Sequence, residues 1–224
     1  MQGPSHLVLS WCFAESIGLR AARDRIIVAW AGLAPDADVL AYIGALVYYR
    51  LDQGLAFENV WRVVHHHYTH GLGFVVLTGI VAYALASKTG SAASRIWVAL
   101  LAMLASAIHN FFDLVGGGRD WPIYPLWPLS DATWSADWSW GIGEWPNVVI
   151  LCACLAGTLL YARLAGRSPL ECMGPRADRW LVGVVRQEKA AAKRDAGWLR
   201  WVIWGGLLVA TIAILAPLGF QVGF

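Results

Sequence analysis

Charge is scarce in this chain of 224 residues: only 14% of the side chains are charged, while 58% are hydrophobic. Soluble globular proteins carry about a quarter charged residues. The shortage of charge and the mean hydropathy of +0.53 therefore predict a membrane protein. The net charge of +2 is too small to indicate a nucleic-acid partner. The four cysteines do not indicate a disulfide framework.

Two further signals are missing. The N-terminus has no basic segment before its apolar stretch, and Glu15 interrupts that stretch, so we expect no cleavable signal peptide. Strand patterns are weak throughout, and an open sheet would leave backbone groups unpaired in lipid. These absences leave helices as the elements that cross the membrane.

Long apolar segments supply the expected helices. A helix needs roughly 20 residues to span a membrane. Four apolar segments come close to this length: 71–86, 96–115, 148–165 and 198–220. Three shorter apolar segments are 7–19, 26–34 and 37–50. We expect them to be partly inserted in the membrane or packed against the spanning helices. The predicted fold is an all-α, polytopic membrane bundle with about four transmembrane helices and short N-terminal helices.

Four of the six histidines lie in the segment WRVVHHHYTH, residues 61–70. On an α-helix His66 and His70 share one face, as do His67 and His70. Packing alone rarely gathers so many imidazoles beside an apolar run, and imidazole is a common zinc ligand. We expect at least two of these histidines to bind a metal.

A second polar pair stands at the end of the apolar segment 96–115, where His109 and Asp113 are four residues apart. This spacing presents an imidazole nitrogen and a carboxylate oxygen on one helix face, a pair suited to zinc, manganese or iron. Alternatively, Asp113 only orients His109. An antiparallel hairpin of 71–86 and 96–115 would bring His70 and Asp113 to the same depth.

Two weaker signals come earlier in the chain. Asp36 and Asp38 follow Pro35, where an apolar helix breaks, and two carboxylates there could complete a metal site. Taken alone, they are better explained by a turn or a helix N-cap. His6 stands where the first apolar segment begins and indicates little by itself.

In chain order, the motifs SHLVLS, PDAD, HHHYTH and HNFFD followed by PLWPLS resemble those of the bacterial membrane-bound metal-dependent hydrolases. That family is also described as LexA-binding and inner-membrane-associated. The resemblance covers residues 5–130. The matching residues are His6; Pro35, Asp36 and Asp38; His65, Thr69 and His70; His109 and Asp113; and Leu126, Trp127 and Pro128. The family is distantly similar to zinc-dependent phospholipase C, which implies phosphoester chemistry in a helical bundle.

The sequence departs from the family motifs in two places. His66 and His67 replace an Arg-Gly pair, which removes a cation suited to phosphate. The segment LVGGGRD follows Asp113 where the family has a threonine, and Arg119 is a candidate replacement cation. The extra imidazoles could instead add a ligand or a base.

These observations together predict a membrane-bound hydrolase of ester or phosphoester bonds in a lipid or lipid-linked substrate. The expected metal ligands are His6, Asp36, His65, His70, His109 and Asp113. Zinc is the favoured ion, with manganese or iron as alternatives, and it would lower the pKa of its water towards about 7. Asp38 or His66 is expected to take the proton from that water.

A competing hypothesis is a non-catalytic, metal-stabilised membrane adaptor that binds a protein partner. Under both hypotheses, membrane lipid is the expected partner of the protein. Metal transport is disfavoured because the candidate ligands gather at one end of the spans. We expect a single domain over 1–224, with the metal-site core in 1–130. The remainder, 131–224, would hold a Trp-rich interfacial loop, a basic connector and C-terminal helices.

Positive charge suggests an orientation in the inner (plasma) membrane. Lys88 and Arg95 flank the turn between the first two long segments, and the basic connector 166–197 would lie on the same side. The positive-inside rule makes that side cytoplasmic and places the histidines on the non-cytoplasmic side. The arginines in 20–25 are not placed by this argument.

Overall fold

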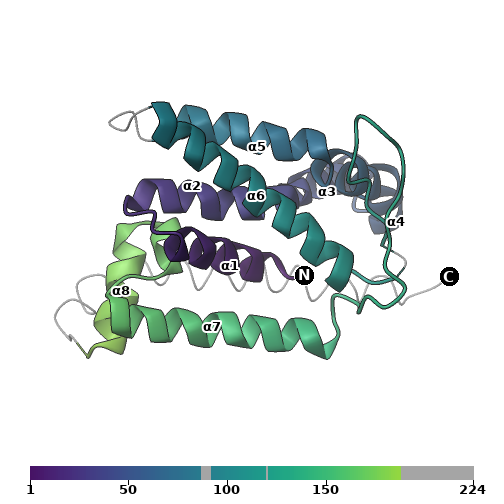
Figure 1. The fold of residues 1–224 in the computed structure, drawn as a ribbon. Helices are drawn as coiled ribbons and strands as arrows, with labels where there is room; N and C mark the ends of the chain where they lie inside the picture. Colours follow the sequence, from purple (N-terminus) through teal and green to yellow (C-terminus); the bar gives the residue numbers. More distant parts are fainter. Residues whose placement is uncertain (87–91, 120, 188–224) are drawn as a thin grey trace. The chain divides into compact units, whose positions relative to one another are not determined.

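The protein is all-helical in a computed structural model that describes residues 1–86, 92–119 and 121–187 (Figure 1). The α-helices are α1 Gly3–Ser16, α2 Ala22–Leu33, α3 Val39–Tyr48, α4 Gln53–Ala56, α5 Leu72–Leu85, α6 Ala92–Gly116, α7 Trp145–Ala165 and α8 Pro175–Val185. Between them lie the 3₁₀ turns η1 Ala34–Asp38 and η4 Pro169–Met173, and the π-helices η2 Phe57–Trp61 and η3 Val64–Thr69. The predicted all-α class is confirmed.

The chain divides into two compact units. The first consists of Met1–Val39 and Arg62–Thr158, and the second of Leu40–Trp61 and Leu159–Phe224. Whether 1–224 behaves as the expected single domain stays a prediction. Every candidate site residue lies in the first unit.

Helices α1, α2, α5 and α6 pack together in the first unit. Small side chains fill their contacts, which allows helix backbones to approach closely. The buried alanines of these helices include Ala14, Ala29, Ala31, Ala82, Ala102 and Ala105. At one end of the α1–α2 hairpin, Arg25 pairs with Glu15 at 3.2 Å. The opposite end therefore brings the start of α1 beside the end of α2.

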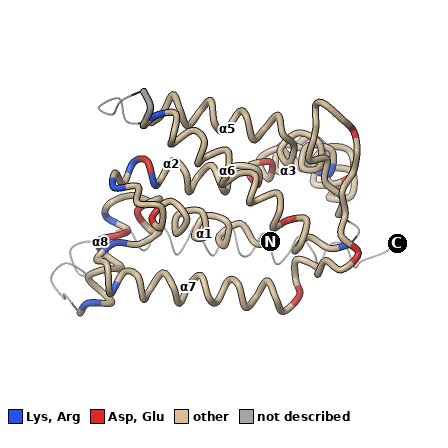
Figure 2. Tube along the Cα trace, viewed as in Figure 1, with Lys and Arg blue, Asp and Glu red and all other residues tan. Residues whose placement is uncertain are grey.

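Charge is unevenly placed in the first unit. Figure 2 shows Lys and Arg at the turn between α1 and α2 and near the start of α6. These residues are Arg20, Arg23, Arg25 and Arg95. The loop between α6 and α7, at the other end of α6, carries the acidic residues Asp131, Asp137 and Glu144.

Within the described residues, three helical segments are long and apolar enough to cross a membrane: Ala22–Tyr48, Ser94–Gly116 and Trp145–Ala165. The bent pair Gln53–Thr69 and Leu72–Leu85 is a fourth candidate if its halves form one broken span. The expected spans 96–115 and 148–165 agree with this result, and 71–86 corresponds to half of the bent pair. The expected span 198–220 lies outside the described residues.

The segment Ala22–Tyr48 corrects the expectation of two separate short helices at 26–34 and 37–50. Pro35 occupies the first turn of η1, where its missing N–H removes no helical hydrogen bond. The helical path therefore continues through the proline with a short 3₁₀ turn. The whole stretch reaches a length and an apolar composition that suit crossing.

The loop between α6 and α7 folds over the start of α5. The Leu72 N–H donates to Pro125 O and the Gly73 N–H to Trp127 O, both at 2.9 Å. These bonds satisfy N–H groups that the first turn of a helix leaves free. Trp134 and Trp138 of the same loop are exposed. The location of this loop at the bilayer surface stays a prediction.

Candidate metal centre

The histidine segment is wound as a π-helix from Val64 to Thr69. This wider turn brings together His65 and His70, five residues apart, with ring centroids separated by 3.9 Å. His70 Nδ1 donates to His65 O at 2.9 Å. The expected sharing of one face by His66, His67 and His70 is wrong, because a π turn holds more residues than an α turn.

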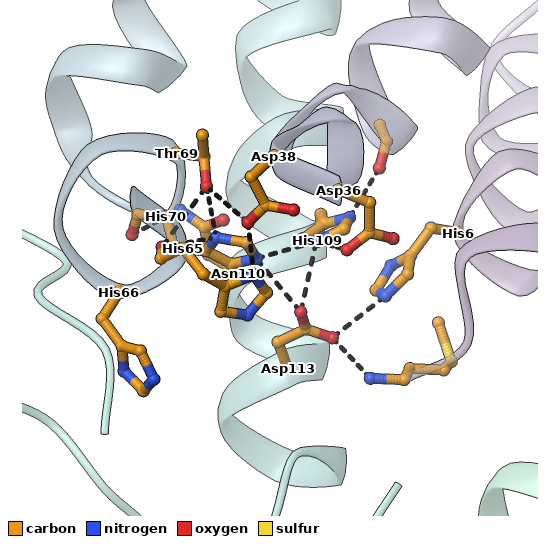
Figure 3. Close-up of polar contacts among 12 residues, drawn as sticks. His6, Asp36, Asp38, His65, His66, Thr69, His70, His109, Asn110 and Asp113 are labelled. Atoms are coloured by element: carbon orange, nitrogen blue, oxygen red, sulfur yellow. Dashed lines mark hydrogen bonds and ion pairs between the residues drawn. The ribbon is translucent and has the colours of Figure 1, made fainter. Parts of the chain in front are cut away.

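His66 and His67 contact the loop between α6 and α7 instead. His66 Nδ1 donates to the carbonyl oxygen of Pro122, and its ring centroid lies 4.4 Å from that of Trp121. His67 stacks on Tyr124 with a centroid distance of 3.7 Å. Figure 3 shows His66 apart from the cluster of acidic groups. Its role as a proton acceptor stays a prediction that this placement does not favour.

Four side chains from three segments converge at one point: Asp36 from η1, His70 from the end of η3, and His109 and Asp113 from α6 (Figure 3). Asp36, His70, His109 and Asp113 each offer a ligand atom, and these atoms lie within 4.8 Å of one another. His70 Nε2 and His109 Nε2 are 3.2 Å apart, and each is 3.2 Å from Asp113 Oδ2. Asp36 Oδ1 is 3.5 Å from His109 Nε2. The α5–α6 hairpin thus brings His70 beside Asp113, as the sequence predicts.

Backbone carbonyls determine which imidazole nitrogens face this point. His109 Nδ1 donates to Gly32 O at 2.8 Å, and His70 Nδ1 donates to His65 O. A carbonyl oxygen only accepts, so both Nδ1 atoms carry a proton, and when the rings are neutral both Nε2 atoms present lone pairs. Lone pairs this close to each other and to a carboxylate repel unless a cation lies among them. The residues therefore fit a divalent metal, and two imidazoles with two carboxylates suit zinc, manganese or iron.

Asp38, His65 and His70 form a second group whose ligand atoms also lie within 4.8 Å of one another. His65 Nδ1 donates to Asp38 Oδ2 at 2.5 Å, and Thr69 Oγ1 donates to the same oxygen at 3.1 Å. A carboxylate bonded to an imidazole nitrogen fixes the orientation of the ring. Asp38 therefore anchors His65 and Thr69, and both of these residues contact His70.

His6 adjoins the centre through Asp113. Its Nε2 lies 3.0 Å from Asp113 Oδ1, and its ring stacks on His109 at a centroid distance of 3.7 Å. The α-amino nitrogen of Met1 also contacts Asp113 Oδ1, at 2.5 Å. Burial lowers the pKa of His6, while the Asp113 carboxylate opposes this shift. His6 is thus a neighbour of the four converging groups and not one of them.

A family model described as YdjM inner membrane protein matches residues 1–216. The chain belongs to the YdjM inner membrane protein family. No curated protein and no solved structure matches it. Membership confirms the inner-membrane location, and the apolar helices agree with a multi-pass protein. The YdjM description names a location and no reaction, so the chemistry has to be argued from the centre itself.

Three groups that hold the centre of this YdjM-family protein were not identified from sequence. Asn110 Nδ2 donates to His70 O at 3.0 Å, the Gly32 carbonyl holds His109, and the Trp121 ring lies 5.2 Å from His65. Asn110 carried a signal, since it is an amide beside His109 within an apolar segment. A backbone carbonyl carries no such signal.

Arg119, the candidate replacement cation, is engaged elsewhere. Its guanidinium donates twice to the carbonyl oxygen of Asp137, at 3.0 and 3.3 Å. The side chain is exposed and ties the two ends of the loop together. The structure thus gives Arg119 a role in shaping the loop.

Replacing the carboxylate behind His65 should weaken metal binding without abolishing it. We expect Asp38→Asn to reduce metal affinity about 10- to 100-fold, because its neutral amide is a poorer acceptor for His65 Nδ1 and Thr69 Oγ1, and both of these residues contact the ligand His70. Competition with a chelator measures the affinity, and Asp131→Asn in the exposed loop is the matched control. Full occupancy should return at high metal concentration. An unchanged affinity would show that Asp38 does not support the centre.

Proposed function

We propose that this protein is a membrane-bound, metal-dependent hydrolase that cleaves phosphoester or other ester bonds of a lipid or lipid-linked substrate. The convergence of two imidazole Nε2 atoms and two carboxylates at one largely buried point carries this proposal. Ionisable groups within membrane helices are costly, and they tend to be kept for function. The position of the centre near the ends of these helices favours a substrate that is itself in the membrane.

One member of the centre is open to solvent. The relative solvent exposure of the Asp36 side chain is 26%, whereas that of His109 is 0% and that of Asp113 is 6%. The substrate would therefore approach on the Asp36 side. When bound, a divalent ion activates a water molecule and polarises the phosphoryl or carbonyl oxygen of the substrate.

The side chains of the centre supply the remaining roles, which are proton transfer and ligand positioning. Asp36 Oδ1 points into the centre and is the accessible carboxylate, so we assign it the proton of the attacking water. Asp113 Oδ2 lies 3.2 Å from Nε2 of both His70 and His109 and would bind the same ion as these imidazoles. Asp38, the proton acceptor expected from sequence, is occupied by His65 and Thr69, which favours Asp36 for this role.

The charge distribution supports an orientation. The arginines at the α1–α2 turn and near the start of α6 lie at the end of the first unit that is opposite the centre (Figure 2). By the positive-inside rule this end faces the cytoplasm, so we place the centre on the non-cytoplasmic side. Arg20 and Arg23, which the sequence alone left unplaced, agree with Arg95 in this arrangement.

Elemental analysis followed by a substrate screen tests the proposed function. The purified protein should contain stoichiometric metal, and the metal-loaded protein should turn over one class among phosphodiester, phosphomonoester and carboxylester lipids. Chelation should abolish this turnover and the same metal should restore it. In sealed vesicles, added water-soluble substrate should be cleaved only when the non-cytoplasmic face is outward. Turnover that survives complete metal removal would reject the proposal.

A non-catalytic, metal-stabilised adaptor is the second candidate. Four protein ligands are enough to close a tetrahedral structural zinc site, and Asp36, His70, His109 and Asp113 are four. This alternative predicts bound metal without turnover of any substrate class, together with unfolding on chelation. The half-buried Asp36 side chain favours the open, catalytic arrangement.

A further inference from the structure

An apolar groove of about 390 Å³ lies between α1 and α6 in the first unit. Its walls include Leu9, Cys12 and Phe13 of α1 and Ala105, Ile108 and Phe112 of α6. Cys12 is exposed at its edge, so the groove is open from outside. Its volume is within the range of small-molecule sites in proteins.

One end of the groove adjoins the metal centre. Leu9 lies one helical turn after His6 on α1, and Phe112 directly precedes Asp113 on α6. The contact between His6 and Asp113 fixes these two ends side by side. From there the lining positions extend over eight residues of each helix, which is seven steps of helical rise and a length of about 10 Å. The groove therefore leads away from the centre, towards the arginine-rich end of the unit.

The surroundings determine what can fill this groove. Water is poorly held in a cavity with apolar walls, and α6 is one of the helices that suit crossing a membrane. Hydrocarbon is then the matching occupant, and lipid chains supply it. Because one end of the groove lies beside the contact between His6 and Asp113, a lipid whose chain lay in it would have its headgroup linkage near these two residues.

We propose that the α1–α6 groove binds one acyl chain of the lipid substrate and thereby positions the bond to be cleaved. This inference rests on the proposed hydrolase function and names its substrate as a lipid recognised through its chain. The length of the groove then limits the affinity for the chain. Each further methylene buried along its length of about 10 Å strengthens binding, and methylenes that extend beyond it do not increase the affinity.

Photocrosslinking tests occupancy independently of turnover. Phosphatidylglycerol carrying a diazirine in one acyl chain is expected to label residues 9–16 and 105–112. Cys12→Trp, which fills the groove, should remove at least about nine-tenths of this labelling. Cys152→Trp is the matched control, because Cys152 is also exposed in an apolar helix but does not line the groove. Labelling that is spread over other helices and is unchanged by Cys12→Trp would overturn the proposal.

Chain-length kinetics test its consequence for the reaction. Among dibutyryl, dihexanoyl and dioctanoyl versions of the cleaved lipid class, KM should fall by about fourfold per methylene, and it should level off only with didodecanoyl chains, which are longer than the groove. Cys12→Trp should flatten this dependence while its metal content stays that of the wild type. Turnover with no dependence on chain length would refute the groove proposal alone. Specific groove labelling without turnover would instead refute only the hydrolase.

Another occupant has its own signature. The alternative outcome of the test is that the apolar segment 198–220 of this chain, which lies outside the described residues, fills the groove. With the other native cysteines replaced by alanine, a disulfide between Cys12 and a cysteine introduced by Val209→Cys or Ala213→Cys would place that segment on the groove. That result would overturn the lipid proposal.

Discussion

Asp113→Asn is expected to eliminate metal binding and, with it, all hydrolase activity. The substitution keeps the shape of the side chain but removes the charge that both His70 Nε2 and His109 Nε2 approach at 3.2 Å. Removing a carboxylate behind a ligand already costs about 10- to 100-fold in affinity. A carboxylate at the centre itself should cost more than about 100-fold. Elemental analysis and chelator competition measure the loss.

The control for this substitution is Asp137→Asn, which changes an exposed carboxylate of the loop between α6 and α7. It should keep wild-type metal content and wild-type turnover. High metal concentration should not restore Asp113→Asn, whereas it should restore Asp38→Asn. This contrast separates a group that binds the ion from a group that only positions a ligand. Retention of stoichiometric metal by Asp113→Asn would remove Asp113 from the centre and would exclude the proposed ligand set.

The members of the centre could be predicted from sequence because they are exceptions to their surroundings. His109 and Asp113 stand out in an apolar segment, and the hairpin that joins their helix to the histidine segment follows from two apolar runs with a short turn. Asp36 and Asp38 looked more like turn residues. Their assignment to the site came from the family resemblance, and the packing of η1 against η3 in the structure explains why they lie beside the histidines.

The faces of the histidine segment could not be predicted, because they depend on a helix type that sequence patterns do not reveal. The α-helical rule groups residues three and four apart, whereas the π-helix η3 groups His65 with His70. The family resemblance nevertheless identified His65 and His70. The motif preserves the spacing that the π turn requires, although the residues alone do not explain it.

The support of the centre was also hidden from sequence, because part of it is backbone. The backbone carbonyl of Gly32 accepts a hydrogen bond from His109, a contact that any residue type could make. The position requires glycine because of the packing between α1 and α2. A Cβ atom at position 32 would lie 1.9 Å from Ser10 Oγ and 2.5 Å from Ser10 Cβ. Helices α1 and α2 can approach this closely only without that atom.

Gly32→Ala should therefore damage both the packing and the metal centre. Rotation of the Ser10 hydroxyl cannot relieve the contact with Ser10 Cβ, so α1 and α2 must separate. Such overpacking costs about 1–3 kcal/mol of stability. The shift moves the carbonyl that holds His109 Nδ1, and we expect metal affinity to fall by about 10- to 100-fold. Thermal unfolding in detergent and chelator competition measure the two effects.

Two further variants test whether steric contact between α1 and α2 causes the loss of metal affinity in Gly32→Ala. Gly157→Ala introduces the same methyl group in helix α7, where a Cβ atom meets nothing within 4 Å, and it should leave metal affinity unchanged. Ser10→Gly combined with Gly32→Ala removes the clashing Cβ atom from the other side, and metal affinity should recover although the glycine itself costs about 1 kcal/mol of helix stability. If the double variant binds metal no better than Gly32→Ala, close packing of α1 on α2 is not what holds His109 in place.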